Sequence, residues 1–153
     1  MSLKIIHTAD WHLGQTFFGY DRDEEHEAFL SWLIDILTLR QTDVLLIAGD
    51  VFDVANPSAA AQRRFFRFLR EANRRNPQLQ IVIIAGNHDS AARLEAPIPL
   101  LEELNTSIVG AVPRTDLCKI DFDSLLIPLY NKEGKREAIC LAVPYLRQGD
   151  YPA

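Results

Sequence analysis

The chain has 153 residues, of which 48% are hydrophobic and 24% charged, the size and mix of one globular domain with a buried core. Its formal net charge of -5 argues against a protein that holds nucleic acid through a broad basic surface, although bound cations can reverse the field inside an acidic cleft. Cys118 and Cys140 are too few for a disulfide scaffold, so we expect buried thiols. Without a membrane-spanning run or a signal peptide, we expect a cytoplasmic protein.

Three apolar runs with a common ending organise the N-terminal part of the chain. Each run consists of aliphatic residues followed by a small residue and then Asp, Asn or His: LKIIHTADWH (3–12), DVLLIAGDVFD (43–53) and IVIIAGNHD (81–89). Runs that are apolar on both faces are typical of parallel strands covered by helices. We therefore expect three buried strands.

Two helical segments separate these runs. Segment 21–43 has an acidic first turn and apolar residues at helical spacing, namely Phe29, Leu33, Ile36 and Leu37. Segment 56–77 has Asn56 or Ser58 as its N-cap, and its helix should end before Pro77. The alternation of strands and helices predicts right-handed βαβ units and a parallel sheet.

From residue 94 onward the sequence no longer alternates between apolar strands and long helices. We expect a short helix in 94–105, a strand in 107–113, and then strands without long helices in 117–123, 124–131 and 137–146, with a turn at KEGK. These strands predict a second sheet, antiparallel or mixed, stacked on the first. Because RQGDYPA offers no obvious cap, we expect residues 1–153 to be the N-terminal part of a larger domain.

The three strand ends carry the chemistry, because ligands of open α/β sheets bind beyond the carboxyl ends of the strands. The side chains there are Asp10 and His12, then Asp50 and Asp53, then Asn87, His88 and Asp89. Carboxylate and amide oxygens favour Mg or Mn, and imidazole extends the choice to Fe, Zn or Ni. Each cluster alone could be a helix cap or a turn with Asx hydrogen bonds. Three such clusters at successive strand ends favour a metal site.

Local spacing supports the same interpretation. Residues two apart in an extended strand face the same side, so Asp10 and His12 are expected to bind one ion together. Gly49 and Gly86 come just before the polar residues and should allow a tight turn and a close backbone approach.

The three motifs, D-x-H at 10–12, G-D-x-x-D at 49–53 and G-N-H-D at 86–89, resemble the first motifs of the calcineurin-like metallophosphoesterases. The surrounding stretches IIHTADWHLGQ, LIAGDVFDVANPS and IAGNHDSAARLE are similar to the SbcD family, the nuclease subunit of the bacterial SbcCD complex. The resemblance implies a four-layer α/β/β/α sandwich in which helices flank two stacked mixed sheets, here truncated at the C-terminus.

The resemblance also implies roles for the site residues. Asp10 and His12 would hold the first of two divalent metal ions, Asp50 would bridge both ions, and Asn87 would hold the second. His88 would be the catalytic group that protonates the leaving sugar oxygen or stabilises the transition state, and Asp53 and Asp89 would orient ligands or His88. The metal would most often be manganese, with Mg, Fe or Zn as alternatives.

The activity implied by the resemblance is hydrolysis of phosphodiester bonds in DNA. It comprises a 3′ to 5′ exonuclease on double strands and an endonuclease on single strands, which process DNA ends and hairpins in repair, recombination and replication. The partners would be DNA, an SbcC-type ATPase subunit and a second copy of the chain. The family's remaining ligands are later histidines, and this sequence has none after His88. We therefore expect weak metal binding and little nuclease activity from this chain alone.

Three further features have a functional and a structural interpretation. Arg67 and Arg70 belong to an arginine-rich helix that could contact DNA, although a solvated helix face is the favoured alternative. Phe17, Phe18 and Tyr20 form an aromatic loop near the site, where packing of one or two rings in the core is the default and DNA contact is implied for the rest. An apolar set could form a dimer interface or simply cover the sheet: Phe65, Phe66, Leu69, Leu94, Leu100 and Leu101.

Two rival functions remain open at this point. The first is a metallophosphatase or phosphodiesterase with the same site and a small substrate. The second is a non-catalytic module that binds DNA ends and docks an ATPase.

Overall fold

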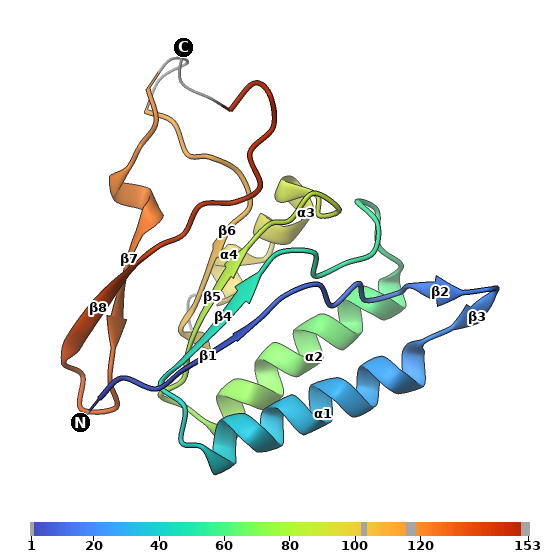
Figure 1. The fold of residues 1–153 in the computed structure, drawn as a ribbon, viewed down its shortest axis with the longest axis horizontal. Helices are drawn as coiled ribbons and strands as arrows, with labels where there is room; N and C mark the ends of the chain where they lie inside the picture. Colours follow the sequence, from blue (N-terminus) through green and yellow to red (C-terminus); the bar gives the residue numbers. More distant parts are fainter. Residues whose placement is uncertain (1, 102–103, 116–118, 151–153) are drawn as a thin grey trace.

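A computed structural model describes residues 2–101, 104–115 and 119–150 (Figure 1). The elements that position the site are β1 (Ile5–Thr8), β2 (Thr16–Phe17), β3 (Tyr20–Asp21), α1 (Asp23–Leu39), β4 (Val44–Ala48), α2 (Ala59–Arg75) and β5 (Gln80–Ile84). The later elements are α3 (Ala91–Glu95), α4 (Ile98–Leu101), β6 (Thr106–Val109), the 3-10 helix η2 (Asp123–Leu125), β7 (Leu126–Tyr130) and β8 (Arg136–Leu141).

The first sheet is parallel throughout, with the strand order β1-β4-β5-β6. It contains the three expected strands and a fourth, β6, which confirms the strand predicted in 107–113 for residues 107–109 but not for 110–113. Helices α1 and α2 lie side by side on one face of this sheet, as Figure 1 shows. The main hydrophobic core lies between these helices and the sheet and includes Leu37, Leu45, Phe65 and Ile81, all fully buried.

The second sheet is the antiparallel hairpin β7–β8, which covers the opposite face of the first sheet. A second core fills the space between the two sheets, formed by Val44, Val82 and Val109 from one side and by Leu125, Ile127, Leu129 and Ala142 from the other. The stacked second sheet predicted from the sequence is therefore confirmed. The described residues supply three of the four expected layers, in the order helices, parallel sheet, antiparallel sheet.

The helix boundaries agree with local sequence signals. Ser58 is the N-cap of α2, and its hydroxyl accepts a hydrogen bond of 3.1 Å from the Ala61 N–H, so the alternative cap Asn56 is wrong. The helix ends at Arg75, before Pro77 as expected. The short helix expected in 94–105 is instead two short helices, α3 and α4, which meet near Pro97.

Two other expectations are only partly within the described residues. The strand predicted in 117–123 is wrong for residues 119–123, which form a single bridge from Ile120 to Arg114 and then enter η2. Cys140 is half-buried, and burial raises the pKa of its thiol, while Cys118 lies outside the described residues. None of the helices in residues 2–101, 104–115 and 119–150 is long and apolar enough to cross a membrane.

Candidate metal centre

The loops that follow β1 and β4 run beside each other beyond the end of the sheet. The N–H groups of Asp10, His12 and Leu13 donate hydrogen bonds of 3.1, 3.0 and 2.9 Å to the carbonyls of Gly49, Asp50 and Val51. This pairing holds the D-x-H and G-D-x-x-D motifs in a fixed register. The backbones of the two motifs therefore lie side by side and are joined by hydrogen bonds.

The backbone at these positions is not that of an extended strand. Strand β1 ends at Thr8, and Asp10, His12 and Asp50 have positive φ angles of 56°, 48° and 49°. The prediction that Asp10 and His12 share a face because they lie in a strand is wrong, although they do come together. Their side chains are aimed by a left-handed turn, a conformation that costs energy in non-glycine residues and is common at ligand sites.

His12 lies at the centre of the candidate metal site. Its Nε2 is 3.9 Å from Asp10 Oδ1 and 4.0 Å from Asp50 Oδ2. Two ligand atoms that each bind an ion at about 2.1 Å can lie up to about 4.2 Å apart, so both separations suit shared coordination. One atom from each of these three residues lies within 4.8 Å of the others. The donor set of two carboxylates and an imidazole fits a divalent cation.

His88 lies in the loop after β5 and is close to the same candidate metal site. Its backbone N–H donates a 3.0 Å hydrogen bond to Asp50 Oδ1, and its Nδ1 lies 2.7 Å from the backbone carbonyl of Asp53. The His88 ring is exposed and stands edge-on to the His12 ring at a centroid separation of 4.9 Å. The Asp53 carbonyl raises the pKa of His88, because it accepts a hydrogen bond from the ring, and nearby Asp50 contributes in the same direction.

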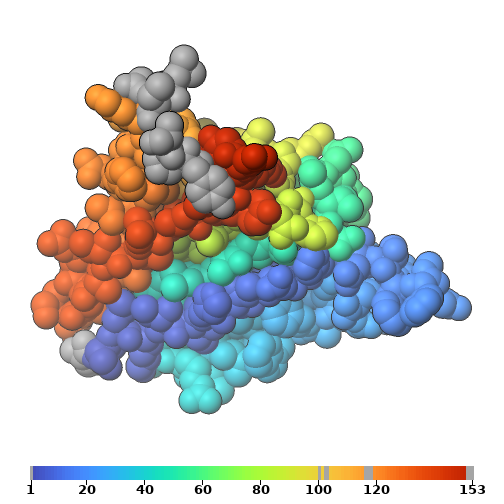
Figure 2. All heavy atoms as spheres, turned by 45° about the horizontal axis from the view of Figure 1, so that its top comes forward, coloured from blue at the N-terminus to red at the C-terminus, as the bar shows by residue number. Residues whose placement is uncertain are grey.

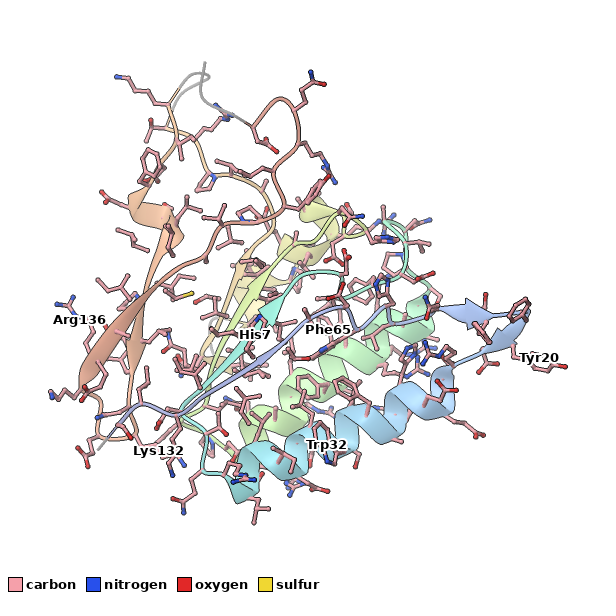
Figure 3. All side chains as sticks on the ribbon, in the orientation of Figure 1. His7, Tyr20, Trp32, Phe65, Lys132 and Arg136 are labelled. Carbon is pink, nitrogen blue, oxygen red and sulfur yellow. The ribbon has the colours of Figure 1, made fainter. Side chains whose placement is uncertain are left out.

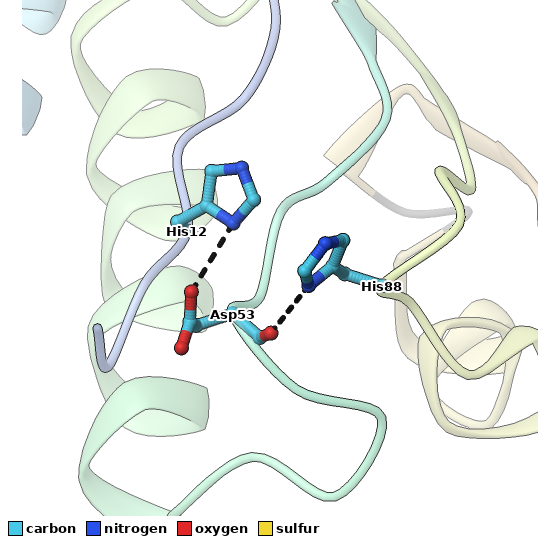
Figure 4. A group of neighbouring side chains, drawn as sticks. All are labelled: His12, Asp53 and His88. Carbon is cyan, nitrogen blue, oxygen red and sulfur yellow. Dashed lines mark hydrogen bonds and ion pairs between the residues drawn. The ribbon is translucent and has the colours of Figure 1, made fainter. Parts of the chain in front are cut away.

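Asp53 adds a second close group of three with His12 and His88 (Figure 4). Its Oδ1 lies 3.3 Å from His12 Nδ1, on the side of the ring opposite to Asp10 and Asp50. The structure thus places Asp53 against both histidines.

Asp89 contacts backbone rather than a histidine or a ligand side chain. Its carboxylate is buried and accepts hydrogen bonds from the N–H groups of Gly86, Val51 and Phe52 at 2.9, 3.2 and 3.0 Å. It therefore ties the loop after β5 to the loop after β4. Asn87 follows Gly86 in the loop after β5, and it is exposed.

The aromatic loop forms the small hairpin β2–β3, which projects beyond the rest of the molecule (Figures 1 and 2, blue). Phe17, Phe18 and Tyr20 are 64%, 88% and 79% exposed, and Tyr20 lies at the far end of the molecule in Figure 3. The expectation that one or two of these rings pack in the core is wrong. Phe17 and Phe18 instead pack edge-on against each other, with their ring centroids 4.6 Å apart.

The arginines of α2 differ in their surroundings. Arg64 is buried and pairs with Asp23 at 2.8 Å and Glu27 at 2.9 Å, and Arg67 also pairs with Glu27. Arg63 and Arg70 are exposed and form no ion pair with the described part of the chain. Much of the arginine set therefore joins α2 to α1, which supports the solvated-face interpretation for Arg67 more than for Arg70.

The apolar set proposed as a dimer face mostly lies in the core. Phe65 and Leu69 are fully buried, Leu94 and Leu101 are nearly so, and Phe66 packs against the same cluster. The side chain of Leu100 lies outside those that the structure describes. The alternative, that these residues cover the sheet, is therefore the one that the structure supports.

Sequence reasoning missed a hollow of about 380 Å³ beside the candidate metal site, which Asp10 and His12 share with Gln15, Arg22 and His26. Arg22 donates to Gln15 Oε1 at 2.7 Å and to Glu25 Oε2 at 2.6 Å, so the loop before α1 is tied to the helix start. The corresponding signal in the sequence is the cluster of charged residues in DRDEEH, which by itself indicates only the start of a helix.

The comparisons with known proteins agree with this geometry. Residues 3–138 match the calcineurin-like phosphoesterase family, and the chain belongs to that family. This match confirms the family resemblance and the fold class that were predicted from the sequence. Members of the family hydrolyse phosphoesters, so the chain belongs to a class of phosphoester hydrolases.

Comparison with individual proteins shows which members of the family the chain is similar to. The chain is 50% identical to the SbcD subunit of the nuclease SbcCD from Rhodobacter capsulatus, over 98% of this chain and 37% of the relative. It is 34% identical to the corresponding SbcD protein of Escherichia coli K12, over 97% of this chain and 34% of the relative. It is 40% identical to that of Bacillus subtilis, over 80% of this chain and 31% of the relative. The chain thus spans about a third of the length of these relatives.

Proposed function

We propose that this chain supplies part of a two-metal phosphodiesterase site in a DNA nuclease subunit of the SbcD type. The observation that carries the proposal is the convergence of His12 Nε2 with the carboxylates of Asp10 and Asp50 at 3.9 and 4.0 Å. The names of the similar proteins supply the substrate class, because each is the SbcD subunit of an SbcCD nuclease.

In this proposal Asp10 and His12 would hold the first metal ion, Asp50 would serve both ions, and Asn87 would help to hold the second. Two bound divalent cations would polarise the phosphate and offset the charge that develops on its oxygens. The hydrogen bond of 3.0 Å from the His88 backbone N–H holds the Asp50 carboxylate in place before any ligand arrives. This preorganisation lowers the cost of assembling the site.

His88 is the proposed catalytic residue. The Asp53 carbonyl fixes one edge of its ring at Nδ1, so the exposed Nε2 edge is free to face a phosphate. An imidazolium at this position would donate a proton from Nε2 to the leaving sugar oxygen.

The finer properties of the proposed nuclease follow from its resemblance to SbcD proteins. We propose manganese as the metal, 3′ to 5′ exonuclease and single-strand endonuclease activity on DNA ends and hairpins, and an SbcC-type ATPase as the partner. The exposed rings of Phe17, Phe18 and Tyr20 and the exposed Arg70 are the proposed DNA contacts, since aromatic rings stack on bases and arginines contact phosphates.

A second copy of the chain is a further proposed partner. Because Phe65 and Leu69 are buried in the core, its contact would have to use other side chains. Analytical ultracentrifugation over a concentration series tests this: dimerisation predicts a sedimentation coefficient that rises with concentration.

The histidine count supports a second candidate function for the chain taken alone. The sequence has four histidines and none after His88, so further imidazole ligands of a two-metal site would have to come from outside these residues. By itself the chain would then act as a DNA-end-binding module with weak metal affinity.

Manganese titration combined with a plasmid-nicking assay tests the proposal. We expect calorimetry to show weak Mn²⁺ binding that Asp50→Asn abolishes, together with little or no nicking by the chain alone. Full-strength cleavage would contradict the partial site, and absence of Mn²⁺ binding would contradict the metal site. Strong hydrolysis of a nitrophenyl phosphodiester without any binding of DNA would favour a small substrate instead.

A further inference from the structure

The hollow beside the candidate metal site has the size of a ligand pocket. Its volume is about 380 Å³, within the range of about 300–1,000 Å³ that is usual for small-molecule sites. Asp10 and His12 form part of its wall, so a group held by the metal site would border it. We infer that the hollow is a subsite for an unstacked nucleobase, that of the nucleotide next to the phosphate at the metal site. The inference rests on the proposed function and deepens it, because it names the part of the DNA that lies beside the metal ions.

Two side chains offer hydrogen-bonding groups to a base in this hollow. Arg22 donates from Nε to Glu25 Oε2 and from Nη1 to Gln15 Oε1, and its Nη2 forms no hydrogen bond within the described residues. The side-chain N–H₂ of Gln15 is also unused there, while its carbonyl oxygen has a second lone pair. A glutamine amide can pair with an adenine edge by donating to N7 and accepting from N6. Gln15 and Arg22 can therefore recognise a base that enters the hollow.

His26 is a second, independent indication of a ligand. Its side chain is only 6% exposed and lines the hollow from α1. Its Nδ1 has no hydrogen-bond partner within residues 2–101, 104–115 and 119–150. Buried polar side chains are nearly always paired, so a ring of this kind needs a polar contact from outside the fold. A base in the hollow would supply polar groups next to this ring.

The charges around the hollow favour a base over a second phosphate. The carboxylates of Asp10 and Glu25 line the same hollow as the Arg22 guanidinium. A phosphate would be attracted by Arg22 but repelled by both carboxylates, whereas a neutral base avoids this repulsion. The half-buried ring of Phe29 also lines the hollow, and an aromatic ring is a surface on which any base can stack.

The base of the aromatic hairpin borders the hollow as well. Gln15 and Arg22 flank β2–β3, and the Arg22 N–H donates to the Gln15 carbonyl at 3.3 Å, which closes the hairpin (Figure 1). A DNA strand that contacts this hairpin and reaches Asp10 and His12 would therefore pass the hollow. An unpaired nucleotide can turn its base into such a hollow at little cost, whereas paired DNA must first be unpaired. The subsite thus favours single-stranded or frayed DNA.

A nuclear magnetic resonance titration of the metal-free chain with 2′-deoxyadenosine tests the subsite. We expect saturable shifts of the Gln15 side-chain amide and of the His26 and Phe29 rings, and no such shifts with 2-deoxyribose, which lacks the base. Gln15→Ala should weaken the binding of 2′-deoxyadenosine about 10-fold, as expected for loss of one paired base edge. Gln78→Ala is the matched control, because Gln78 is exposed just before β5 and should leave the affinity unchanged.

Gln15→Glu is the second variant, for the case in which the alanine variant does not fold. It keeps an oxygen that can accept from Arg22 and removes the N–H₂ group, so it should also weaken binding. Absence of saturable shifts at the hollow, or unchanged affinity in both variants, would overturn the inference.

Calorimetry with Mn²⁺ separates the subsite from the proposed function. In the presence of Mn²⁺, deoxyadenosine monophosphate should bind more tightly than 2-deoxyribose 5-phosphate. Equal affinity of the two phosphates would overturn the base subsite and leave the metal site standing. If 2′-deoxyadenosine binds in the hollow but Mn²⁺ does not strengthen the binding of deoxyadenosine monophosphate, the proposed function fails and the base subsite stands.

Discussion

The carboxylate of Asp50 fills the space in which a side chain on Gly86 would lie. A Cβ atom built on Gly86 would overlap both the Asp50 carboxylate and the Asp50 backbone nitrogen, and one built on Gly49 would come within 2.8 Å of Gly86 Cα. The two glycines therefore allow the ends of β4 and β5 to approach each other until Asp50 reaches the centre of the site. Gly49 also needs its left-handed backbone, with φ of 88°.

Gly86→Ala should both destabilise the fold and damage the metal site. The methyl group cannot be accommodated by a side-chain rotation alone because it meets backbone, so we expect a loss of about 1–3 kcal/mol, typical of overpacking. Asp50 should also be displaced, and Mn²⁺ affinity should fall. Urea unfolding and calorimetry measure the two effects. Gly149→Ala is the control, since no atom lies within 4 Å of the added methyl, and wild-type behaviour of Gly86→Ala would contradict the close packing.

Asp89→Asn tests the link between the loops after β4 and β5. The carboxylate accepts from three backbone N–H groups, and an amide would place its own N–H₂ against at least one of them. Leaving a buried donor without an acceptor should cost about 1–3 kcal/mol. Denaturation curves of Asp89→Asn and of the exposed control Asp123→Asn compare the two sites. Equal stability of the two variants would show that the Asp89 contacts contribute little.

The sheet and its helices could be predicted because their signals are local. Burial on both faces of β4 and β5 requires continuous aliphatic runs, and the amphipathic pattern of α1 and α2 follows from covering one face of that sheet. The residues at the strand ends could also be predicted to converge, because parallel strands end at one edge. Asp10 and His12, however, come together because both have a left-handed backbone conformation, which could not be predicted from their residue types.

Other features depended on contacts that only the folded chain reveals. Asp53 and Asp89 look alike in the sequence, yet one contacts histidines and the other contacts backbone N–H groups 37 and 38 residues away in sequence. The arginines of α2 form a regular pattern, but Arg64 turns inward to carboxylates of α1 while Arg70 faces solvent. Partners across such distances are set by packing rather than by spacing along the chain.

Trp11 joins the core to the candidate metal site, so its loss should be costly. The ring lies edge-on to Phe29, Phe65 and Phe68, and its Nε1–H donates to Thr8 Oγ1 at 2.9 Å. Trp11→Ala should cost about 3–5 kcal/mol, as expected for removal of a buried aromatic side chain. Urea unfolding followed by circular dichroism measures this loss. Trp32→Ala is the matched control, because Trp32 is 56% exposed, and similar losses in both variants would contradict the central role of Trp11.

The buried imidazole of His26 should make the stability of the chain depend on pH. Burial lowers the pKa of His26 because it disfavours the imidazolium, and the positive charges of Arg22 and Arg64 act in the same direction against the weaker opposing effect of Asp23 and Glu25. The folded state therefore holds this ring neutral at a pH where the unfolded chain, with an ordinary pKa of about 6.5, already takes up a proton.

The contribution of His26 is thus fully present above about pH 6.5 and is lost as the pH falls through the lower folded-state value. His26→Leu removes the titrating group, so its free energy of unfolding should fall less steeply between pH 7.5 and 5 than that of the unaltered chain. Urea unfolding at several pH values gives both slopes, and His7→Gln, at an exposed position, should retain the steeper one. Identical slopes for His26→Leu and the unaltered chain would mean that other groups control the acid sensitivity of the fold.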